Sequence, residues 1–154
     1  MHRIPVRQIM TSPPITIRPE AKVADAGEMM DEYHVRRLPV VDEAGCLLGI
    51  VTDSDVLEAE TAGSVLNSYD PDADESWLTV EEIMTTDVIT VGPHETVGQL
   101  VIKLMENQIG GLPVVVPDAA DPRCMKVIGV ISETDIFEMI AEAWRQEEAS
   151  LVIA

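Results

Sequence analysis

Residues 49–57 read GIVTDSDVL, and residues 129–137 read GVISETDIF, so one stretch of chain occurs twice. The same duplication is present upstream, where VRQIMTSPPITI at 6–17 returns as VEEIMTTDVITV at 80–91. An internal repeat defines the structural unit of a chain, and it is read before any other pattern. Two copies with no third predict a closed module of two lobes rather than a solenoid.

The register of the two copies is constant over most of their length. Met10 and Met84 are 74 residues apart (84 − 10), and the LPVV segment keeps this shift. Gly49 and Gly129 are 80 residues apart (129 − 49), so the second copy carries six extra residues around 117–126. The extra residues fall between two apolar segments, where a longer loop is the expected consequence.

Composition limits the class of protein. The chain has 154 residues, which is one domain's worth, and each copy of about 55–60 residues is marginal for independent stability. We therefore expect the two copies to bury apolar faces against each other. Ten Lys and Arg against 28 Asp and Glu give a net charge of −18, which argues against a nucleic-acid partner because phosphate binding needs cations.

Targeting signals and cysteine usage point to the cytoplasm. The first ten residues, MHRIPVRQIM, have no continuous apolar core, so they do not resemble a secretory signal. No run approaches the ~18 apolar residues of a membrane span, and no membrane insertion is expected. Cys46 and Cys124 occupy non-equivalent places in the repeat and form no CxxC motif. We interpret them as reduced thiols of a cytoplasmic protein.

Hydrophobic patterning predicts the same elements in both copies. The first copy reads as a strand at 15–17, a helix from Pro19–Glu20 with apolar Val23, Ala26, Met30 and Tyr33, strands at 38–41 and 46–51, and a helix from Thr52 or Asp53 to Ala59. The second reads as a strand at 89–91, a helix at 95–107, strands at 112–116 and 127–131, and a longer helix from Glu133. The predicted domains are copy 1 at 1–60, an acidic surface connector at 61–79, and copy 2 at 80–154.

The pattern of IMT, a short TI strand, a helix, RRLPVVD and GIVTxxDV resembles the cystathionine-β-synthase (CBS) domain. A tandem couple of these domains forms a CBS pair, or Bateman module, and the resemblance runs from about Val6 to about Ala141. It implies an α+β fold of two pseudo-symmetric β-α-β-β-α units packed through their sheets. It also implies clefts between the units that bind adenosine-containing ligands, and a homodimer of two pairs.

A hydroxyl at the end of a strand followed three residues later by a carboxylate at a helix start recurs in both copies. Thr52 with Asp55 and Ser132 with Asp135 have this spacing. A carboxylate can accept hydrogen bonds from both ribose hydroxyls, and a helix N-terminus attracts phosphate. The alternative is ordinary helix capping. The resemblance assigns the ribose and phosphate contacts to Thr52, Ser54 and Asp55, and to Ser132, Thr134 and Asp135.

The expected adenine and phosphate contacts differ in kind. The chain has one Phe, two Tyr and two Trp, so the base is expected between the aliphatic side chains Val35, Ile50, Ile109 and Val130, whose alternative role is core packing. Arg36 and Arg37 offer guanidinium groups suited to phosphate, unless they pair with surface carboxylates. The matching residues of copy 2 are Gly110 and Gly111, so phosphate recognition is expected to be lopsided. The resemblance favours a main site that joins Asp135 with Val35 and Arg36.

The sequence gives little support for a metal site or for an enzyme. Asp70, Asp72, Asp74 and Glu81 match some EF-hand positions, but Glu75 stands where the loop needs Gly. The three histidines share no ligand spacing, and His34 is interpreted as an exposed residue at a helix end. No nucleophile–base arrangement is visible, so we expect neither an enzyme nor a metal site, and no required cofactor.

The sequence thus predicts a stand-alone regulatory module. Its expected ligand is AMP, ADP or ATP, which would modulate an unidentified partner protein. Two alternatives stay open, a ligand-free structural or dimerisation module and a sensor of S-adenosylmethionine or NAD.

Overall fold

The computed structural model describes residues 1–69 and 78–153, with the side chains at 63–69, 152 and 153 outside that description. The chain forms two compact units, and each draws on both halves of the sequence. Unit 1 comprises Met1–Pro14, Ile89–Val116 and Ile128–Ala154, and unit 2 comprises Ile15–Val88 and Pro117–Val127. The boundaries of the units are therefore not those of the repeat.

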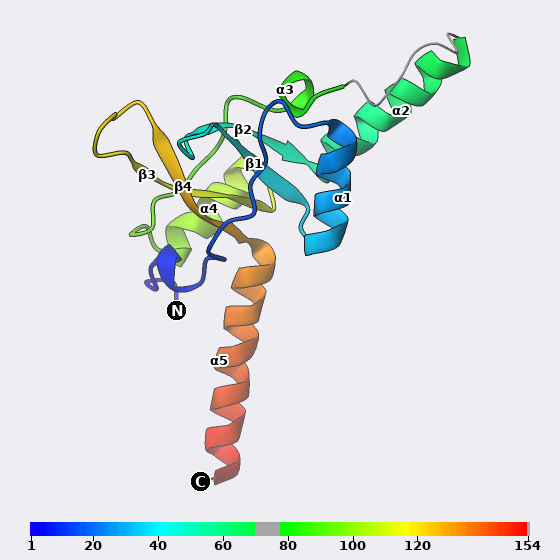
Figure 1. Ribbon diagram of the computed structural model, residues 1–154. Coiled ribbons are helices and arrows are strands. Elements are labelled where there is room, and N and C mark those ends of the chain that lie inside the picture. The colour runs from blue at the N-terminus through cyan, green and yellow to red at the C-terminus, as the bar shows by residue number, and fades with distance from the viewer. Residues whose placement is uncertain (70–77, 154) are drawn as a thin grey trace. The chain divides into compact units, whose positions relative to one another are not determined.

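The elements follow the order expected from the repeat (Figure 1). The first copy supplies η1 (Val6–Gln8), α1 (Val23–Tyr33), β1 (Arg37–Val41), β2 (Leu47–Thr52) and α2 (Asp53–Tyr69). The second supplies α3 (Val80–Ile83), α4 (Val97–Asn107), β3 (Gly111–Pro117), β4 (Met125–Ser132) and α5 (Glu133–Ile153). Strand β1 pairs with β2, and β3 pairs with β4, in two separate two-stranded sheets. The predicted α+β class is confirmed.

The short strands expected at 15–17 and 89–91 are single bridges instead. Ile17 pairs with Val40, and Val91 pairs with Val114, each in the parallel direction. Proline explains the shortness of the first of them, because Pro13, Pro14 and Pro19 flank it and offer no N–H for a ladder.

The lead segment of each copy packs on the core of the other copy. We call residues 4–11 and 78–85 the two leaders. In unit 2, the N–H of Val80 donates to the carbonyl of Ala21 at 2.8 Å. Thr85 and Ile50 exchange two backbone hydrogen bonds of 2.9 Å each, which joins this leader to β2. The side chain of Val80 is fully buried among first-copy residues.

Unit 1 repeats this arrangement with the roles exchanged. The N–H of Val6 donates to the carbonyl of Glu95 at 2.8 Å. Thr11 and Val130 exchange two backbone hydrogen bonds of 2.8 and 3.0 Å, which joins the first leader to β4. Every one of these contacts has its counterpart in unit 2 at the repeat-equivalent position. The exchange is therefore reciprocal.

The leaders also explain why helices α1 and α4 begin later than the sequence suggested. The carbonyl of Leu78 accepts the N–H of Val23, and the carbonyl of Ile4 accepts the N–H of Val97. A leader thus satisfies an N–H that a helix leaves unpaired in its first turn.

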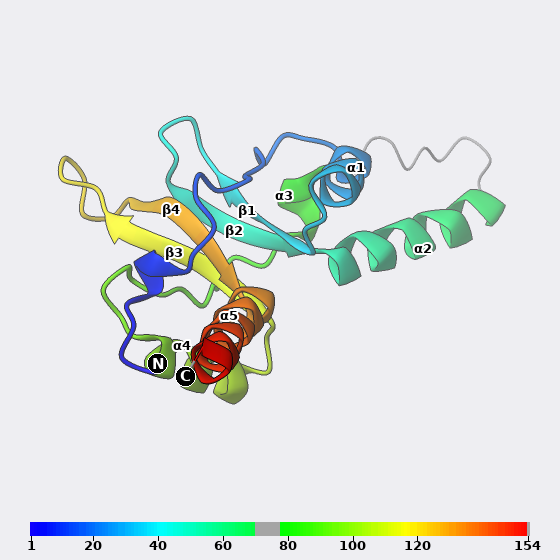
Figure 2. The ribbon, with the colours of Figure 1, turned by 90° about the horizontal axis from the view of Figure 1, so that it is seen from below.

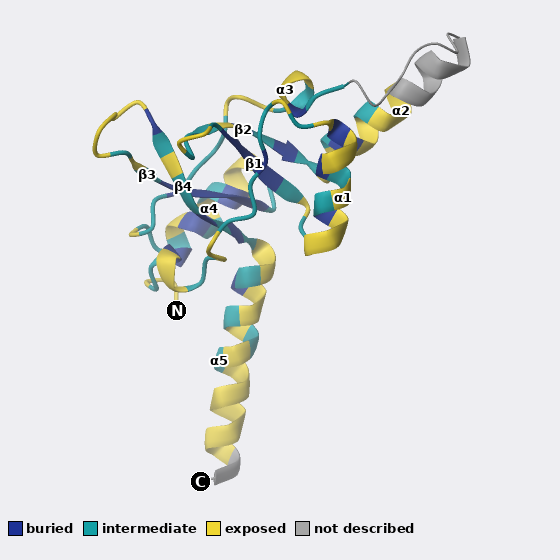
Figure 3. Ribbon diagram, viewed as in Figure 1, coloured by how far each residue is buried: buried dark blue, intermediate teal, exposed yellow. Residues whose placement is uncertain are grey.

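Each unit has its own apolar core (Figure 3). The core of unit 2 consists of Ile17, Val23, Ala26, Met30, Leu38, Val40, Val51, Val56 and Val80. The core of unit 1 consists of Val6, Val91, Leu100, Leu104, Leu112, Val114, Ile131 and Ile136. Of the apolar positions predicted for the first helix, Val23, Ala26 and Met30 are buried, whereas Tyr33 is 48% exposed. In unit 2, α1 lies alongside α2 (Figures 1 and 2).

The second helix of copy 1 is longer than predicted. We expected it to end at Ala59 and to give way to a surface loop, but α2 continues to Tyr69. The stretch after Ala59 contains no proline before Pro71, and a single glycine, Gly63, is tolerated within a helix. The middle of the connector, with the EF-hand-like Asp70, Asp72 and Asp74, lies outside the described residues. No described helix is both long and apolar enough to cross a membrane.

The expectation of two reduced thiols is wrong. Cys46 and Cys124 form a disulfide within unit 2, with their Cα atoms 5.2 Å apart. This separation is within the range that a disulfide bridges. The pairing was missed because the cysteines are not repeat-equivalent. The six-residue insertion of copy 2 brings Cys124 back to the turn where Cys46 lies.

Two glycines allow the leaders to approach the strands. A Cβ at Gly49 would lie 2.7 Å from Met84 Sδ and 2.8 Å from the carbonyl oxygen of Thr85. At Gly129, a Cβ would lie 2.7 Å from Met10 Sδ and 3.1 Å from the carbonyl oxygen of Thr11. Backbone atoms form part of both contacts, so an added methyl group would have to displace a leader.

We therefore predict that Gly49→Ala destabilises the fold by roughly 1–3 kcal/mol, the usual cost of overpacking. Chemical denaturation followed by circular dichroism measures this change. Gly92→Ala is the matched control, because the nearest atom to its Cβ is Glu95 Oε2 at 3.7 Å. Equal stability of the Gly49→Ala variant and the parent protein would contradict the close approach of the leader.

Candidate functional site

The two hydroxyl-and-carboxylate motifs occupy equivalent places at the starts of α2 and α5. The backbone N–H of Thr52 donates to Asp55 Oδ2 at 2.9 Å, and the N–H of Asp55 donates to the Thr52 hydroxyl at 3.2 Å. This reciprocal pair has the geometry of a capping box, with Asp at the third helical position. Burial classes at 51–60 and 131–140 are identical residue by residue. The repeat therefore produces the same local structure twice.

The second motif keeps the bond from the strand-end N–H to the carboxylate, but its hydroxyl donates to Asp135 rather than accepting the N–H of Asp135. Asp135 Oδ2 accepts the N–H of Ser132 at 2.9 Å and its hydroxyl at 3.4 Å. Asp135 Oδ1 accepts the hydroxyl of Thr11 at 3.4 Å. Within the described part of the chain, no hydrogen bond reaches Oδ1 of Asp55. The two carboxylates thus differ in their donors at both oxygens.

Helix capping, the alternative weighed for these carboxylates, does occur in both copies. It occupies Oδ2 of each residue and leaves Oδ1 of Asp55 for another donor. Ser54 and Thr134 are exposed in the first turns of α2 and α5. A ligand role for these residues stays a prediction that is compatible with capping.

Arg36 and Arg37 lie at the same end of the β1–β2 sheet as the first motif. Arg37 is the cross-strand partner of Thr52, and the N–H of Asp53 donates to the carbonyl of Arg36 at 2.8 Å. Arg36 is exposed, and its guanidinium forms no ion pair with the acidic residues of the described chain. Arg37 is half-buried. This rim of unit 2 therefore places Arg36 close in the fold to the first carboxylate motif.

The corresponding rim of unit 1 lacks that charge. Gly110 stands where copy 1 has Arg36, and its carbonyl accepts the N–H of Glu133 at 2.9 Å. The backbone is thus the same in both copies, and the side chain differs. The predicted inequality of the copies concerns charge rather than fold.

Left-handed residues lead into both rims. His34 and Gln108 cap α1 and α4 with φ of 55° and 53°. Each turn is closed by the next residue, where the N–H of Val35 donates to the Met30 carbonyl at 3.0 Å. The equivalent bond in unit 1 runs from Ile109 to Leu104 at 3.1 Å. His34 is exposed at the helix end, as the sequence indicated.

The four aliphatic residues expected around an adenine are all half-buried. These residues are Val35, Ile50, Ile109 and Val130. The backbone N–H groups of Ile50 and Val130 already donate to the carbonyls of Thr85 and Thr11. They are therefore unavailable to the edge of a base, and only the side chains of these two residues could contact it.

Sequence reasoning missed Thr11, which contacts the carboxylate of Asp135. The signal was present, because Thr11 and Thr85 follow the methionine of the IMT segment at the same place in both copies. The repeat alone assigns no role to this threonine. Its pairing with the other copy depends on the leader exchange, which the sequence does not reveal.

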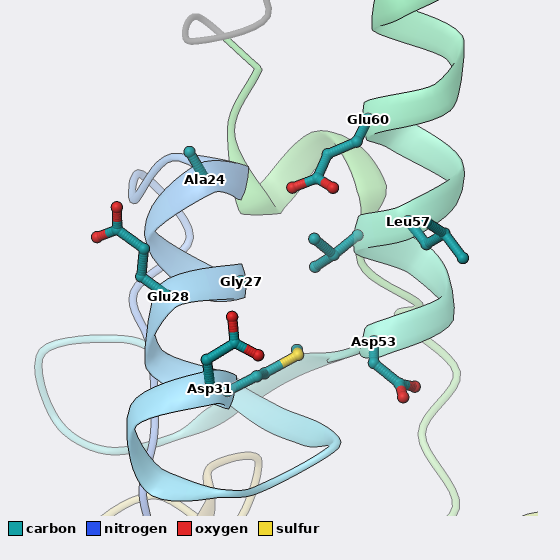
Figure 4. Close-up of a pocket in the computed structure, with 9 residues that line it drawn as sticks. Ala24, Gly27, Glu28, Asp31, Asp53, Leu57 and Glu60 are labelled. Atoms are coloured by element: carbon teal, nitrogen blue, oxygen red, sulfur yellow. The ribbon is translucent and has the colours of Figure 1, made fainter.

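A groove of about 380 Å³ lies between α1 and α2 in unit 2. Its lining includes Glu28, Asp31, Asp53 and Glu60. Figure 4 shows Asp31 and Glu60 extending into the space between the helices. None of the predicted ligand residues lines it, and its negative charge is unsuited to a phosphate. No cluster of three or more metal-ligand residues is found in the described parts of the chain.

Comparison with known proteins agrees with the repeat. The profile of the CBS domain matches residues 6–62 and 80–142. An L-aspartate semialdehyde sulfurtransferase of Methanocaldococcus jannaschii is 33% identical over 131 residues, which is 85% of this chain and 22% of that protein. The chain spans about a quarter or less of the first curated relatives that it matches.

Two solved structures resemble the whole fold. The CBS domain pair of protein MJ0100, in complex with 5′-methylthioadenosine and S-adenosyl-L-methionine, has a TM-score of 0.72 at 30% identity and covers 90% of this chain and 97% of that one. CBSX2 in complex with AMP has a TM-score of 0.71 at 26% identity and covers 91% and 98%. A chloroplastic CBSX2 of Arabidopsis thaliana is 30% identical over 152 residues, covering 87% of this chain and 61% of that protein.

We predict that Asp55→Ala lowers the free energy of unfolding by about 1 kcal/mol, because the cap of α2 is lost. Asp55→Asn keeps an oxygen acceptor for the Thr52 N–H and is expected to lose less. Thr96→Ala, which removes the capping box of α4, should match the alanine variant in stability. Urea denaturation of the three variants measures these differences. A neutral effect of Asp55→Ala would show that the cap contributes little.

Proposed function

Because this chain belongs to the CBS domain family and carries two copies of the domain, we propose that it is a non-enzymatic regulatory module that binds an adenosine-containing ligand. The observation that carries the proposal is the doubled motif. A carboxylate stands at the start of a helix in each unit, and Asp55 retains one oxygen without a described donor. A ribose diol offers two donors to such a group. The S-adenosyl-L-methionine bound to the MJ0100 domain pair and the AMP bound to CBSX2 belong to this ligand class.

Arg36 directs the proposal towards a nucleotide with a phosphate. It is the exposed guanidinium at the rim of unit 2, whereas the equivalent residue of unit 1 is a glycine. Guanidinium binds phosphate oxygens through paired, charge-assisted hydrogen bonds. We therefore place AMP, ADP or ATP ahead of S-adenosylmethionine, whose sulfonium group is cationic.

The regulated protein is unidentified, and the mechanism would be a population shift. A ligand favours the conformation that it binds more tightly, and by no more than the difference in affinity. The related sulfurtransferase is several times longer than its matched region, which supports the proposal that the regulated activity of such a module resides outside the CBS pair. A cytoplasmic location also remains a prediction, and the disulfide bears on it because disulfides persist mainly in oxidising compartments.

We predict a thermal shift with AMP, ADP or ATP. A ligand at ~100 times its dissociation constant adds ~2.7 kcal/mol to stability, which is several degrees in a chain of this size. S-adenosylmethionine, methylthioadenosine and NADH form the comparison panel, and chromatography of each mixture tests for turnover. Flat melting curves with all ligands would favour the ligand-free structural module, and conversion of any ligand would favour an enzyme.

The variant Arg36→Ala tests whether this arginine contacts the phosphate of AMP. Loss of one charge-assisted contact, ~1.5–3 kcal/mol, should weaken AMP about 10- to 100-fold in calorimetry and weaken adenosine much less. Arg7→Ala is the control, because Arg7 is an exposed arginine that belongs to unit 1, whereas Arg36 belongs to unit 2. Equal losses for AMP and adenosine would contradict a phosphate contact.

A double-mutant cycle then decides which carboxylate works with Arg36. Asp55→Asn and Asp135→Asn are each combined with Arg36→Ala, and the AMP affinity of every variant is measured. A ligand held by both members of a pair gives non-additive losses, whereas independent groups give additive ones. The family resemblance favours Asp135, and the rim of unit 2 brings Arg36 near the Asp55 motif.

We also propose that the protein forms a homodimer through α5. Phe137, Ile140, Trp144 and Leu151 are 62%, 45%, 62% and 68% exposed. Their spacing of three, four and seven residues places them on one face of the helix. A row of large apolar side chains in water is characteristic of an interaction surface, and a twofold dimer covers such a row with its own copy.

The dimer prediction is tested by light scattering after size-exclusion chromatography. The double variant Phe137→Glu, Trp144→Glu should elute as a monomer, because four buried charges would face one another across the interface. Gln146→Glu adds the same charge to the opposite face of α5 and should remain dimeric. A dimeric double variant would exclude this face.

A further inference from the structure

The disulfide joins two segments that belong to different copies of the repeat. Cys46 closes the turn between β1 and β2, and Cys124 lies in the inserted loop between β3 and β4. The two residues are 78 positions apart in sequence. The inserted loop, residues 117–127, belongs to unit 2, whereas the following residues of β4 belong to unit 1. The bond therefore links the loop between β3 and β4 of copy 2 to the turn between β1 and β2 of copy 1.

Each of the two segments has its own internal hydrogen bonds. In the turn, Asp42 Oδ1 accepts the N–H groups of Ala44 and Cys46 at 2.9 and 3.0 Å. Gly45 completes the turn with a φ of 85°. These bonds are local to the first copy. They would hold the turn, and with it the sulfur of Cys46, without the disulfide.

The inserted loop is closed in the same local way. The N–H of Cys124 donates to the carbonyl of Asp121 at 3.0 Å, and the carbonyl of Cys124 accepts the N–H of Asp118 at 2.9 Å. Lys126 Nζ lies 4.0 Å from Asp118 Oδ1. The loop thus presents Cys124 from a structure that does not depend on the turn.

Few other bonds connect the loop to the turn. Among the described residues, one backbone hydrogen bond joins them, from the N–H of Val127 to the carbonyl of Gly45 at 3.3 Å. It flanks a single bridge between Cys46 and Lys126. A lone hydrogen bond contributes little net stability once water competes for its partners. The disulfide is the main connection between these two ordered segments.

We propose that Cys46 and Cys124 form a thiol–disulfide switch that controls the docking of the inserted loop on unit 2. A thiolate of a dithiol reductant attacks Sγ of half-buried Cys46, the S–S bond breaks, and Cys124 leaves as a thiolate that takes up a proton. The second thiol of the reductant displaces Cys46. Two electrons and two protons pass to the protein, and the reductant becomes a disulfide.

The switch acts on the strands that carry the two carboxylate motifs. Cys46 directly precedes β2, which ends at Thr52, and Cys124 directly precedes β4, which ends at Ser132. The oxidised pair therefore ties together the starts of both strands. After reduction, only the hydrogen bond from Val127 to Gly45 is described as holding the start of β4 against the turn. This inference does not require that the carboxylates bind a ligand.

Hydrogen–deuterium exchange of the full chain, with and without dithiothreitol, tests the switch. The amide of Val127, whose hydrogen bond to Gly45 joins the loop to the turn, should exchange about tenfold faster after reduction, since undocking of the loop is no longer opposed by the cross-link. Peptides of α1 should not change. Thiol titration in denaturant should find no free thiols before reduction and two after it.

The variant Cys46→Ser, Cys124→Ser is the control that separates reduction from side effects of the reagent. It should exchange like the reduced protein and ignore dithiothreitol. Equal exchange of oxidised and reduced protein would overturn the proposal. Two free thiols after incubation with oxidised glutathione would also overturn it. So would faster exchange of α1 together with the loop, because the disulfide would then stabilise the whole fold rather than the docking of the loop.

Discussion

The fold depends on the exchange of leaders between the two copies. Each copy has a helix and a two-stranded sheet, but it lacks the segment that closes its own core. Val6 fills the core that contains Val91 and Leu100, and Val80 fills the core that contains Ile17 and Val23. Because both valines are fully buried, neither core is complete without a residue from the other half of the sequence. The leaders also explain where α1 and α4 begin and why β2 and β4 need glycine.

The backbone of the candidate site is nearly the same in both units, because both are built by the same exchange. The two copies of the site differ in a few side chains. The bond from the strand-end N–H to Asp55 or Asp135, the left-handed residues His34 and Gln108, and the burial of both strand ends are the same in the two units. Charge differs, since Arg36 in one rim corresponds to glycine in the other. Under the proposed function, this pattern would offer two similar places to a ribose but unequal ones to a phosphate.

Most of the local structure could be predicted from the sequence, because it rests on short-range patterns. The apolar strand LPVV, the helix with Val97, Leu100 and Leu104, and the hydroxyl-to-carboxylate spacing all gave elements or caps where expected. The repeat strengthened each of these inferences by presenting it twice. The resemblance to the CBS domain rested on the same segments, and the family comparison confirmed it.

The remainder could not be predicted because it depends on which distant segments meet. Cys46 and Cys124 do not occupy equivalent positions in the repeat, so the repeat offers no reason to pair them. They meet because Cys124 lies in the inserted loop, which packs beside the turn that contains Cys46. Thr11 has no visible role until the first leader lies beside β4. The length of α2 was misjudged for a different reason, because a polar composition was taken as a loop although no proline interrupts it before Pro71.

The leader exchange also has a consequence for the origin of the chain. Since the backbone hydrogen bonds described above for each leader have equivalents 74 or 80 residues away, two separate single-copy chains could make the same backbone contacts by trading leaders. Joining the copies converts a concentration-dependent association into an intramolecular one, governed by the effective concentration within one chain. Once fused, the copies are free to diverge in side chains such as Arg36, but not at the points of exchange. Gly49 constrains Met84, and Gly129 constrains Met10, so substitutions at these positions must be matched across the two halves of the molecule.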